Sequence, residues 1–192
     1  MSRPAAFSGA VLAGGASRRM GVDKAMLVLD GRPLVVRVAD ALTAAGAAEV
    51  LVVGGDRRAI ERLGLNYVPD RAPGSGPLGG LVTAMEAAPS AVVVVLATDL
   101  VHPDADAIAR LVDTLDATPA CDAAVPIVGG RRQWLHAAWR RAGRAALDDA
   151  FVAGERAIHR AVAASSLRVA NVPGLPPRAM ADADRPDQVP SR

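Results

Sequence analysis

Val92–Leu96, with the sequence VVVVL, is the stretch that decides the fold, and it lies inside the longest unbroken apolar run of the chain, Ala91–Ala97. A strand with one face in water alternates apolar and polar residues, whereas a strand covered on both faces has no such alternation. The run therefore predicts a central strand that is buried on both faces. Asp99 follows the run closely, just past the end of the expected strand.

Short apolar runs alternate with amphipathic stretches along the chain. The runs predict strands at Phe7–Ala13, Val50–Val53, Asn66–Val68, Ala91–Ala97, Ala123–Val128, Leu135–Trp139 and Leu167–Val172. The amphipathic stretches predict helices near Leu34–Ala45, Arg57–Leu63, Leu81–Ala87, Asp104–Leu115, Arg141–Val152 and Ala157–Ala164. Strands that alternate with helices are typical of α/β proteins. We therefore expect a Rossmann-like, doubly wound α/β fold, with a mostly parallel sheet and helices on both faces.

The size and composition indicate a globular protein. A length of 192 residues fits a single domain, 1–192, and we expect its tail from about residue 174 to be loosely ordered. With 51% hydrophobic and 22% charged residues, the composition excludes a disordered chain. A single cysteine, Cys121, excludes a disulfide framework and a cysteine-rich zinc site. The apolar runs are too short for a membrane span or a signal peptide, so we expect a cytoplasmic protein without a membrane partner.

The charges favour a small phosphorylated ligand over a nucleic acid. The net charge is only +2, the basic residues are scattered, and Lys24 is the single lysine among them. Aromatic residues make up 3% of the chain, too few to stack the bases of a single-stranded nucleic acid. We therefore expect no nucleic-acid partner.

The loop after the first expected strand carries the strongest functional signal. Ligands of a doubly wound sheet bind beyond the carboxyl ends of its strands. Gly14 and Gly15 let backbone N–H groups approach an anion, and Arg18, Arg19 and Lys24 can neutralise phosphate oxygens. The pattern matches neither a P-loop nor a dinucleotide-binding loop. It favours a phosphate-binding loop, with a glycine turn and solvated arginines as the structural alternative.

Residues 12–24, with the sequence LAGGASRRMGVDK, resemble the signature of the MobA-like nucleotidyltransferases, and most closely that of the molybdenum cofactor guanylyltransferases. The family pattern is Leu-Ala-Gly-Gly-x-Ser-x-Arg-Met-Gly-x-Asp-Lys, followed by an apolar stretch and Gly-x-Pro-Leu, which stands here at residues 31–34. Further matches extend over nearly the whole chain, at Asp70, Gly76–Gly80, Asp99 and Gly154–Arg156.

The resemblance implies transfer of GMP from GTP to the phosphate of molybdenum-bound molybdopterin, with release of pyrophosphate and with Mg²⁺ as cofactor. The implied partners are GTP, a molybdopterin-type phosphorylated acceptor and, transiently, a molybdoenzyme or a cofactor-delivery protein. The implied nucleotide-binding residues are Leu12, Ala13, Gly14, Gly15, Lys24, Asp70 and Asp99. The implied metal ligands are Asp99 and Asp184, and the implied catalytic residues are Arg19, Lys24 and Asp99.

The chemistry of the residues agrees with this implication. Both reactants of a nucleotidyl transfer to a phosphate are anionic, so a catalyst must supply positive charge and hold the reactants in line. Lys24, an arginine of the loop and the loop amides can neutralise a triphosphate. Mg²⁺ takes one or two carboxylates and several waters, and Asp99 can supply one carboxylate. The alternative role of Asp99 is an N-cap for the helix that begins near Pro103.

Three other segments keep two interpretations each. Asp70 binds the nucleotide, as the resemblance implies, or forms an Asx-turn before Pro73. Residues 74–80 are too glycine-rich for a helix, and they either bring bare backbone against a base or form a flexible connection. Asp184 is a second metal ligand or part of a frayed acidic tail.

The loop near residue 155 is also ambiguous. Arg156 meets the phosphate of the acceptor, as the resemblance implies, or Gly154 caps a helix and Glu155 and Arg156 form a solvated pair. Two positions depart from the family pattern: Gly54 stands near the place of an asparagine, and Val101 stands in place of a proline.

We expect the three histidines, His102, His136 and His159, to be surface or core residues, because they lack metal-ligand spacing.

Two further functions stay open from the sequence. The first is transfer of another nucleotide, such as CMP from CTP, or transfer to another phosphorylated acceptor, because the loop at residues 14–24 contacts phosphates and not the base. The second is a nucleotide-binding regulator without turnover, which the departures at Gly54 and Val101 would suit.

Overall fold

A computed structural model of the chain describes residues 6–14 and 24–180. The strands are β1 (Phe7–Leu12), β2 (Val28–Leu29), β3 (Arg32–Pro33), β4 (Glu49–Val53), β5 (Asn66–Val68), β6 (Val92–Ala97), β7 (Ala123–Val128), β8 (Arg131–Arg132), β9 (His136–Arg140) and β10 (Val169–Val172). The α-helices are α1 (Leu34–Ala44), α2 (Arg57–Arg62), α3 (Pro77–Ala87), α4 (Ala105–Ala117), α5 (Arg144–Val152) and α6 (Ile158–Ala163). Every strand and helix that the sequence predicts is present; the ends of β5 and β7 agree with the prediction, and the other elements have shifted ends. None of the described helices is long and apolar enough to cross a bilayer.

The main sheet is mixed but mainly parallel. Its strands stand in the order β10-β7-β9-β6-β1-β4-β5, with β8 paired to β7. β1 runs parallel to its neighbours β4 and β6, whereas β9 runs antiparallel to β6 and β7. The connection from β7 to β9 spans only residues 129–135, which is too short for the crossover that parallel strands need. The predicted mostly parallel α/β sheet is therefore confirmed, with β9 reversed.

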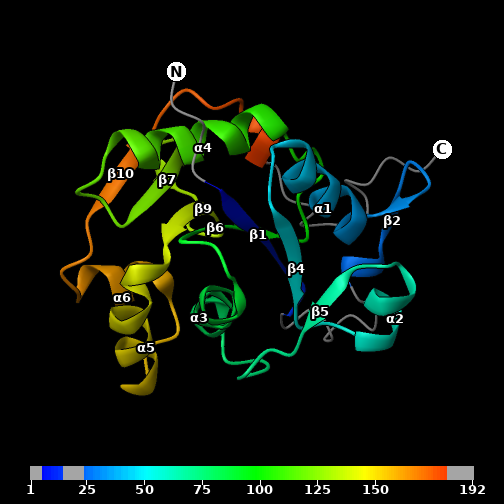
Figure 1. Cartoon of the computed structure of the whole chain (residues 1–192), viewed down its shortest axis with the longest axis horizontal. Coiled ribbons are helices and arrows are strands. Elements are labelled where there is room, and N and C mark those ends of the chain that lie inside the picture. The colour runs from blue at the N-terminus through cyan, green and yellow to red at the C-terminus, as the bar shows by residue number, and fades with distance from the viewer. Residues whose placement is uncertain (1–5, 15–23, 181–192) are drawn as a thin grey trace.

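Helices cover both faces of this sheet (Figure 1). α1 and α4 pack on one face, and α3, α5 and α6 pack on the other. β6 contributes to both apolar cores: Val92, Val94 and Leu96 join the cluster of α1 and α4, while Val93 and Val95 join the cluster of α3. The prediction of a central strand buried on both faces is confirmed.

A hairpin that the sequence analysis did not predict leads into α1. β2 and β3 are joined by Asp30 and Gly31, which have φ angles of 50° and 76°. A two-residue Asp-Gly turn with positive φ at both positions matches the twist of the strands that it joins. Leu29 of the hairpin packs with Leu34 and Val101 in a small buried cluster. The cluster fixes the hairpin against the segment that follows β6.

The start of α3 corrects one expectation. The prediction that residues 74–80 are too glycine-rich for a helix is wrong for 77–80, which form the first turn of α3. Pro77 occupies the first helical position, where its missing N–H is not needed. Gly76 precedes it with a φ of 84°, a conformation that favours glycine.

The two glycines inside α3 serve its packing. A Cβ on Gly79 would lie 3.1 Å from the ring of Phe151, and a Cβ on Gly80 would lie 3.4 Å from the side chain of Leu12. The contact at Gly79 is tighter than an ordinary van der Waals contact, whereas the one at Gly80 is an ordinary contact. Glycine at position 79 therefore lets α3 lie close to α5, and this gain offsets the low helix propensity of glycine.

The last described segment returns to the face that α4 covers. Leu175 and Ala179 are buried in the same apolar cluster as α4, and Pro177–Met180 forms a 3-10 helix. Arg110 of α4 donates hydrogen bonds to the carbonyl oxygens of residues 173 and 174, at 2.9 and 3.1 Å. These contacts anchor the chain after β10.

Candidate active site

The site lies where the chain changes the side of the sheet on which it adds strands. After β1 it adds β4 and β5 on one side and later β6 on the other. Doubly wound sheets bind ligands at this switch point, beyond the carboxyl ends of the strands. Leu12 stands opposite Ala97, and the buried hydroxyl of Thr98 donates to the carbonyl oxygen of Leu12 at 3.2 Å. The residues after β1 and the residues after β6 therefore begin side by side.

Lys24 and Asp99 face each other at this edge. Nζ of Lys24 lies 3.5 Å from Oδ2 of Asp99, and the two side chains are 32% and 24% exposed. Ala25 and Leu100, the residues that directly follow them, are buried and anchor the two backbones. Because the pair itself is partly open to solvent, it stabilises the fold only weakly. Its position suits the binding of a charged ligand.

The capping alternative for Asp99 is wrong. α4 has its own N-cap, Asp104, whose Oδ1 accepts hydrogen bonds from the backbone N–H groups of Asp106 and Ala107 at 2.9 and 3.0 Å. Asp99 pairs with Lys24 instead. The carboxylate of Asp99, just after β6, is therefore not used as a helix cap.

Glycine backbone forms the floor of the site. Gly54 follows β4 with a φ of 75°, and a Cβ there would lie 3.1 Å from the N and Cα atoms of Gly14. A Cβ on Gly14 would in turn lie 3.3 Å from Oδ2 of Asp70. The ends of β1 and β4 thus pack backbone against backbone, which leaves no space for an asparagine at position 54.

Replacing Gly54 with Ala tests this floor. The new Cβ would press on the backbone of Gly14 and would also strain a left-handed residue, which costs about 1–2 kcal/mol. We expect a lower melting temperature together with a loss of nucleotide affinity of about tenfold, which corresponds to about 1.4 kcal/mol of binding free energy.

Gly64→Ala is the matched control for this variant. Gly64 has a similar φ of 73°, but a Cβ there would meet nothing within 4 Å. We therefore expect a smaller drop in melting temperature, from the left-handed strain alone, with unchanged nucleotide affinity by calorimetry. Equal affinities in the two variants would contradict the role of the floor.

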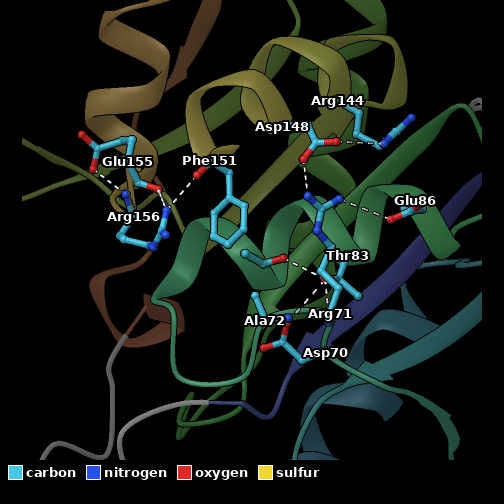
Figure 2. A network of polar contacts seen from close by, with 11 residues as sticks. Asp70, Arg71, Ala72, Thr83, Glu86, Arg144, Asp148, Phe151, Glu155 and Arg156 are labelled. Atoms are coloured by element: carbon cyan, nitrogen blue, oxygen red, sulfur yellow. Dashed lines mark hydrogen bonds and ion pairs between the residues drawn. The ribbon is translucent and has the colours of Figure 1, made fainter. Parts of the chain in front are cut away.

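Asp70 forms an Asx-turn and also faces the floor. Its Oδ1 accepts a hydrogen bond from the N–H of Ala72 at 3.0 Å and lies 3.5 Å from the hydroxyl of Thr83 (Figure 2). The turn alternative for Asp70 is confirmed. The other oxygen, Oδ2, is the one near Gly14. The turn and a contact with a ligand would thus use different oxygens of the same carboxylate.

Ion pairs tie the turn of Asp70 to α3 and α5. Arg71, the next residue, pairs with Asp148 of α5 and, at 3.6 Å, with Glu86 of α3 (Figure 2). Arg144 pairs with the second oxygen of Asp148 at 3.6 Å. The hydrogen bond with Asp148 raises the pKa of Arg71 above its usual value, so the charge of Arg71 persists at all physiological pH values.

Phe151 links this network to the loop after α5. The guanidinium of Arg71 lies 5.5 Å from the centre of the Phe151 ring, and the guanidinium of Arg156 lies 4.3 Å from it (Figure 2). Such cation–π contacts each stabilise a protein by about 0.5–1 kcal/mol at exposed sites. The edge of the same ring packs on Gly79. One aromatic ring therefore joins the turn of Asp70, α3 and the loop of Arg156.

The charged side chains of the loop after α5 form hydrogen bonds with nearby residues. Gly154 follows the last turn of α5 with a φ of 99°, so the glycine cap is confirmed, whereas the ion pair of Glu155 is with Arg160. Glu155 accepts hydrogen bonds from Arg160 and from two backbone N–H groups, and these lower its pKa to about 2. Nη1 of Arg156 donates to the carbonyl oxygens of Phe151 and Glu155, at 2.8 and 2.7 Å. Arg156 stays exposed beside α5.

The histidines lie in the places that the sequence predicts. His136 is buried at the start of β9, opposite Leu96, while His102 and His159 are exposed. Burial lowers the pKa of His136 to about 4, against the opposing effect of the Asp99 carboxylate. His136 is therefore neutral at pH 7, and it adds packing but no charge to the surroundings of Asp99.

The described residues bring one set of sequence-predicted residues to a single edge of the sheet: Leu12, Ala13, Gly14, Lys24, Asp70 and Asp99. Gly15, Arg18, Arg19 and Asp184 lie outside the described residues. Within residues 6–14 and 24–180 there is no group of three or more His, Cys, Asp or Glu side chains that could hold a metal ion. The pairing of Lys24 with Asp99 was not predicted, because the sequence contains no local signal for it.

Comparison with known proteins identifies the family that has this arrangement. Residues 9–169, most of the chain, match the MobA-like NTP transferase domain. The chain belongs to the MobA-like NTP transferase family. The resemblance seen in residues 12–24 is thereby confirmed.

Relatives and a solved structure agree with membership of this family. The chain is 37% identical to a protein from Chloroflexus aggregans named probable molybdenum cofactor guanylyltransferase, over 82% of this chain and 77% of the relative. It is 35% identical to the molybdenum cofactor guanylyltransferase of Rhodobacter capsulatus, over 80% and 79%. The crystal structure of molybdopterin-guanine dinucleotide biosynthesis protein A from Archaeoglobus fulgidus superposes with a TM-score of 0.70, at 24% identity, over 86% of this chain and 83% of that chain. This last likeness supports the fold.

Proposed function

We propose that this member of the MobA-like NTP transferase family is a molybdenum cofactor guanylyltransferase. It transfers GMP from GTP to the phosphate of molybdenum-bound molybdopterin and releases pyrophosphate. Relatives named for this activity match 82% and 80% of the chain. Within the structure, the observation that carries the proposal is the Lys24–Asp99 pair at the switch point of the sheet.

The reaction sets the demands on the site. An oxygen of the acceptor phosphate attacks the α-phosphorus of GTP and forms a new P–O bond, while the bond to the β-phosphate oxygen breaks. Both reactants carry negative charge, so their repulsion must be neutralised before they meet. Lys24 supplies one positive charge at the edge where the triphosphate is proposed to bind. Arg19, outside the described residues, is the proposed second cation.

The nucleotide is proposed to contact the backbone of residues 12–15, together with Lys24, Asp70 and Asp99. The approach of Gly54 to Gly14 supports this placement, because it holds the chain after β1 close to Asp70 without an intervening side chain. Backbone N–H groups free of bulky neighbours are good donors to phosphate oxygens.

The chemistry of Asp99 fits a magnesium ion. Its carboxylate is partly exposed and already lies beside a cation, the ammonium of Lys24. Mg²⁺ binds one or two carboxylates together with water and phosphate oxygens, so it does not need a larger cluster of protein ligands. When bound, the ion neutralises and orients the triphosphate oxygens. Asp184, outside the described residues, is the proposed second ligand.

A panel of nucleoside triphosphates tests this function. We expect pyrophosphate release with GTP, Mg²⁺ and molybdopterin together, and none when any one of them is omitted. A preference for CTP would keep the reaction class and contradict the guanylyl assignment. Stabilisation of the protein by GTP without any pyrophosphate release would instead contradict catalysis.

A further inference from the structure

One side chain of α1 reaches both segments that carry the proposed catalytic pair. Arg37 donates from Nη2 to the carbonyl oxygen of Val101 at 3.2 Å and from Nη1 to Oδ2 of Asp30 at 3.4 Å. Val101 lies two residues after Asp99, in the segment that follows β6. Asp30 lies in the hairpin that follows Lys24. A single guanidinium therefore bridges the two segments.

The residues around this bridge are tightly packed. Leu29, Leu34 and Val101 are buried together, and Leu34 also donates its backbone N–H to the carbonyl oxygen of Leu27 at 2.8 Å. The Arg37 side chain is only 20% exposed. The hairpin, the start of α1 and the segment after β6 thus pack together, and Arg37 contacts two of these segments.

The third nitrogen of the guanidinium, Nε, lowers the stability of the folded protein. This atom is buried and has no hydrogen-bond partner among the described residues. A buried polar atom without a partner destabilises a folded protein. An aliphatic residue would avoid this cost, so the benefit of an arginine lies in the two contacts of its outer nitrogens.

We propose that Arg37 is a positioning residue that holds Asp99 in place beside Lys24. This inference rests on the proposed function, because it concerns the approach of Mg²⁺ and GTP to Asp99. Arg37 acts through the backbone at Val101 and through the hairpin turn. The planar fork of arginine reaches two acceptors at once, whereas the ammonium of lysine is a single point of charge.

The test compares Arg37→Met with Arg32→Met. Methionine keeps an apolar stem and removes the hydrogen bonds. Arg32 also joins the hairpin to α1, through an ion pair with Asp40, but both of these side chains are more than half exposed. Calorimetry without acceptor gives the affinity for GTP in Mg²⁺ and in EDTA, and the ratio of the two affinities isolates the contribution of the metal.

We expect Arg37→Met to lower this ratio about tenfold, the size seen when a group that orients a metal ligand is lost. The Mg²⁺ concentration that half-saturates pyrophosphate release should rise by a similar factor. Arg37→Lys should restore part of the ratio, and Arg32→Met should match the wild type. A purely structural role would lower the melting temperature of Arg37→Met and leave the ratio unchanged.

Two results would overturn the proposal: an unchanged ratio in folded Arg37→Met and Arg37→Lys, or an equal fall in Arg32→Met. Both leave the proposed function intact, since wild-type turnover is measured in parallel. A wild-type protein that gains no affinity from Mg²⁺ and releases no pyrophosphate would contradict the proposed function itself, and the present inference with it.

Discussion

Replacing Asp99 with Asn is expected to abolish magnesium-dependent pyrophosphate release and to leave the fold intact. An amide oxygen is neutral, and Mg²⁺ binds it far less strongly than a carboxylate. The ion pair with Lys24 is partly exposed, so its loss should change the free energy of unfolding by at most about 1 kcal/mol. Steady-state turnover and thermal unfolding measure the two effects separately.

Asp104→Asn is the matched control for this prediction. It makes the same chemical change near the same end of the sheet, at the N-cap of α4. Asparagine caps a helix about as well as aspartate, so turnover and stability should both stay near those of the wild type. Wild-type rates in the Asp99 variant would remove Asp99 from the mechanism. Loss of folded protein would make its role structural.

Lys24→Ala is expected to lower turnover by about 10²–10³, as does the loss of one preorganised charge-stabilising donor in other enzymes. The ammonium of Lys24 also lies beside the Asp99 carboxylate, where it competes with any other cation. Removing it should therefore leave the Mg²⁺ requirement unchanged or lower it. Turnover at several Mg²⁺ concentrations distinguishes this pattern from that of the Asp99 variant.

Lys24→Arg is the companion to the alanine variant. It keeps the positive charge but spreads it over a broader fork, so we expect a rate between those of the wild type and Lys24→Ala. If alanine changes turnover by only a few-fold, Lys24 does not neutralise the transition state. A raised Mg²⁺ requirement in Lys24→Ala would show that the lysine places Asp99.

The sheet could be predicted because a strand that is buried on both faces consists almost entirely of apolar residues. β6 is apolar without interruption, and its neighbour β1 lies in a second apolar run. Once the strands are located, the carboxyl-end rule places Gly14 and Asp99 at one edge. The family signature pointed to the same residues, because it spans the loop after β1.

Other parts of the site depend on contacts between distant segments. Lys24 and Asp99 meet across segments that are far apart in the sequence, and the hairpin after Lys24 packs on Val101, which neither local sequence reveals. The first turn of α3 was mistaken for a loop because the propensity of glycine disfavours a helix, whereas close packing on Phe151 requires glycine. The Asp-Gly signal of the hairpin, by contrast, was present in the sequence and was overlooked.

The antiparallel direction of β9 determines where the chain can accept an insertion near the site. Because β7 and β9 are linked by a short return, the tip of that return stands at the same margin of the sheet as the reacting groups. At the tip, Gly129 and Gly130 are both left-handed and surrounded by open space. Lengthening such a tip costs little and leaves the register of the adjoining strands untouched. An insertion at this tip can thus alter one flank of the sheet edge while β1 and β6 keep their places.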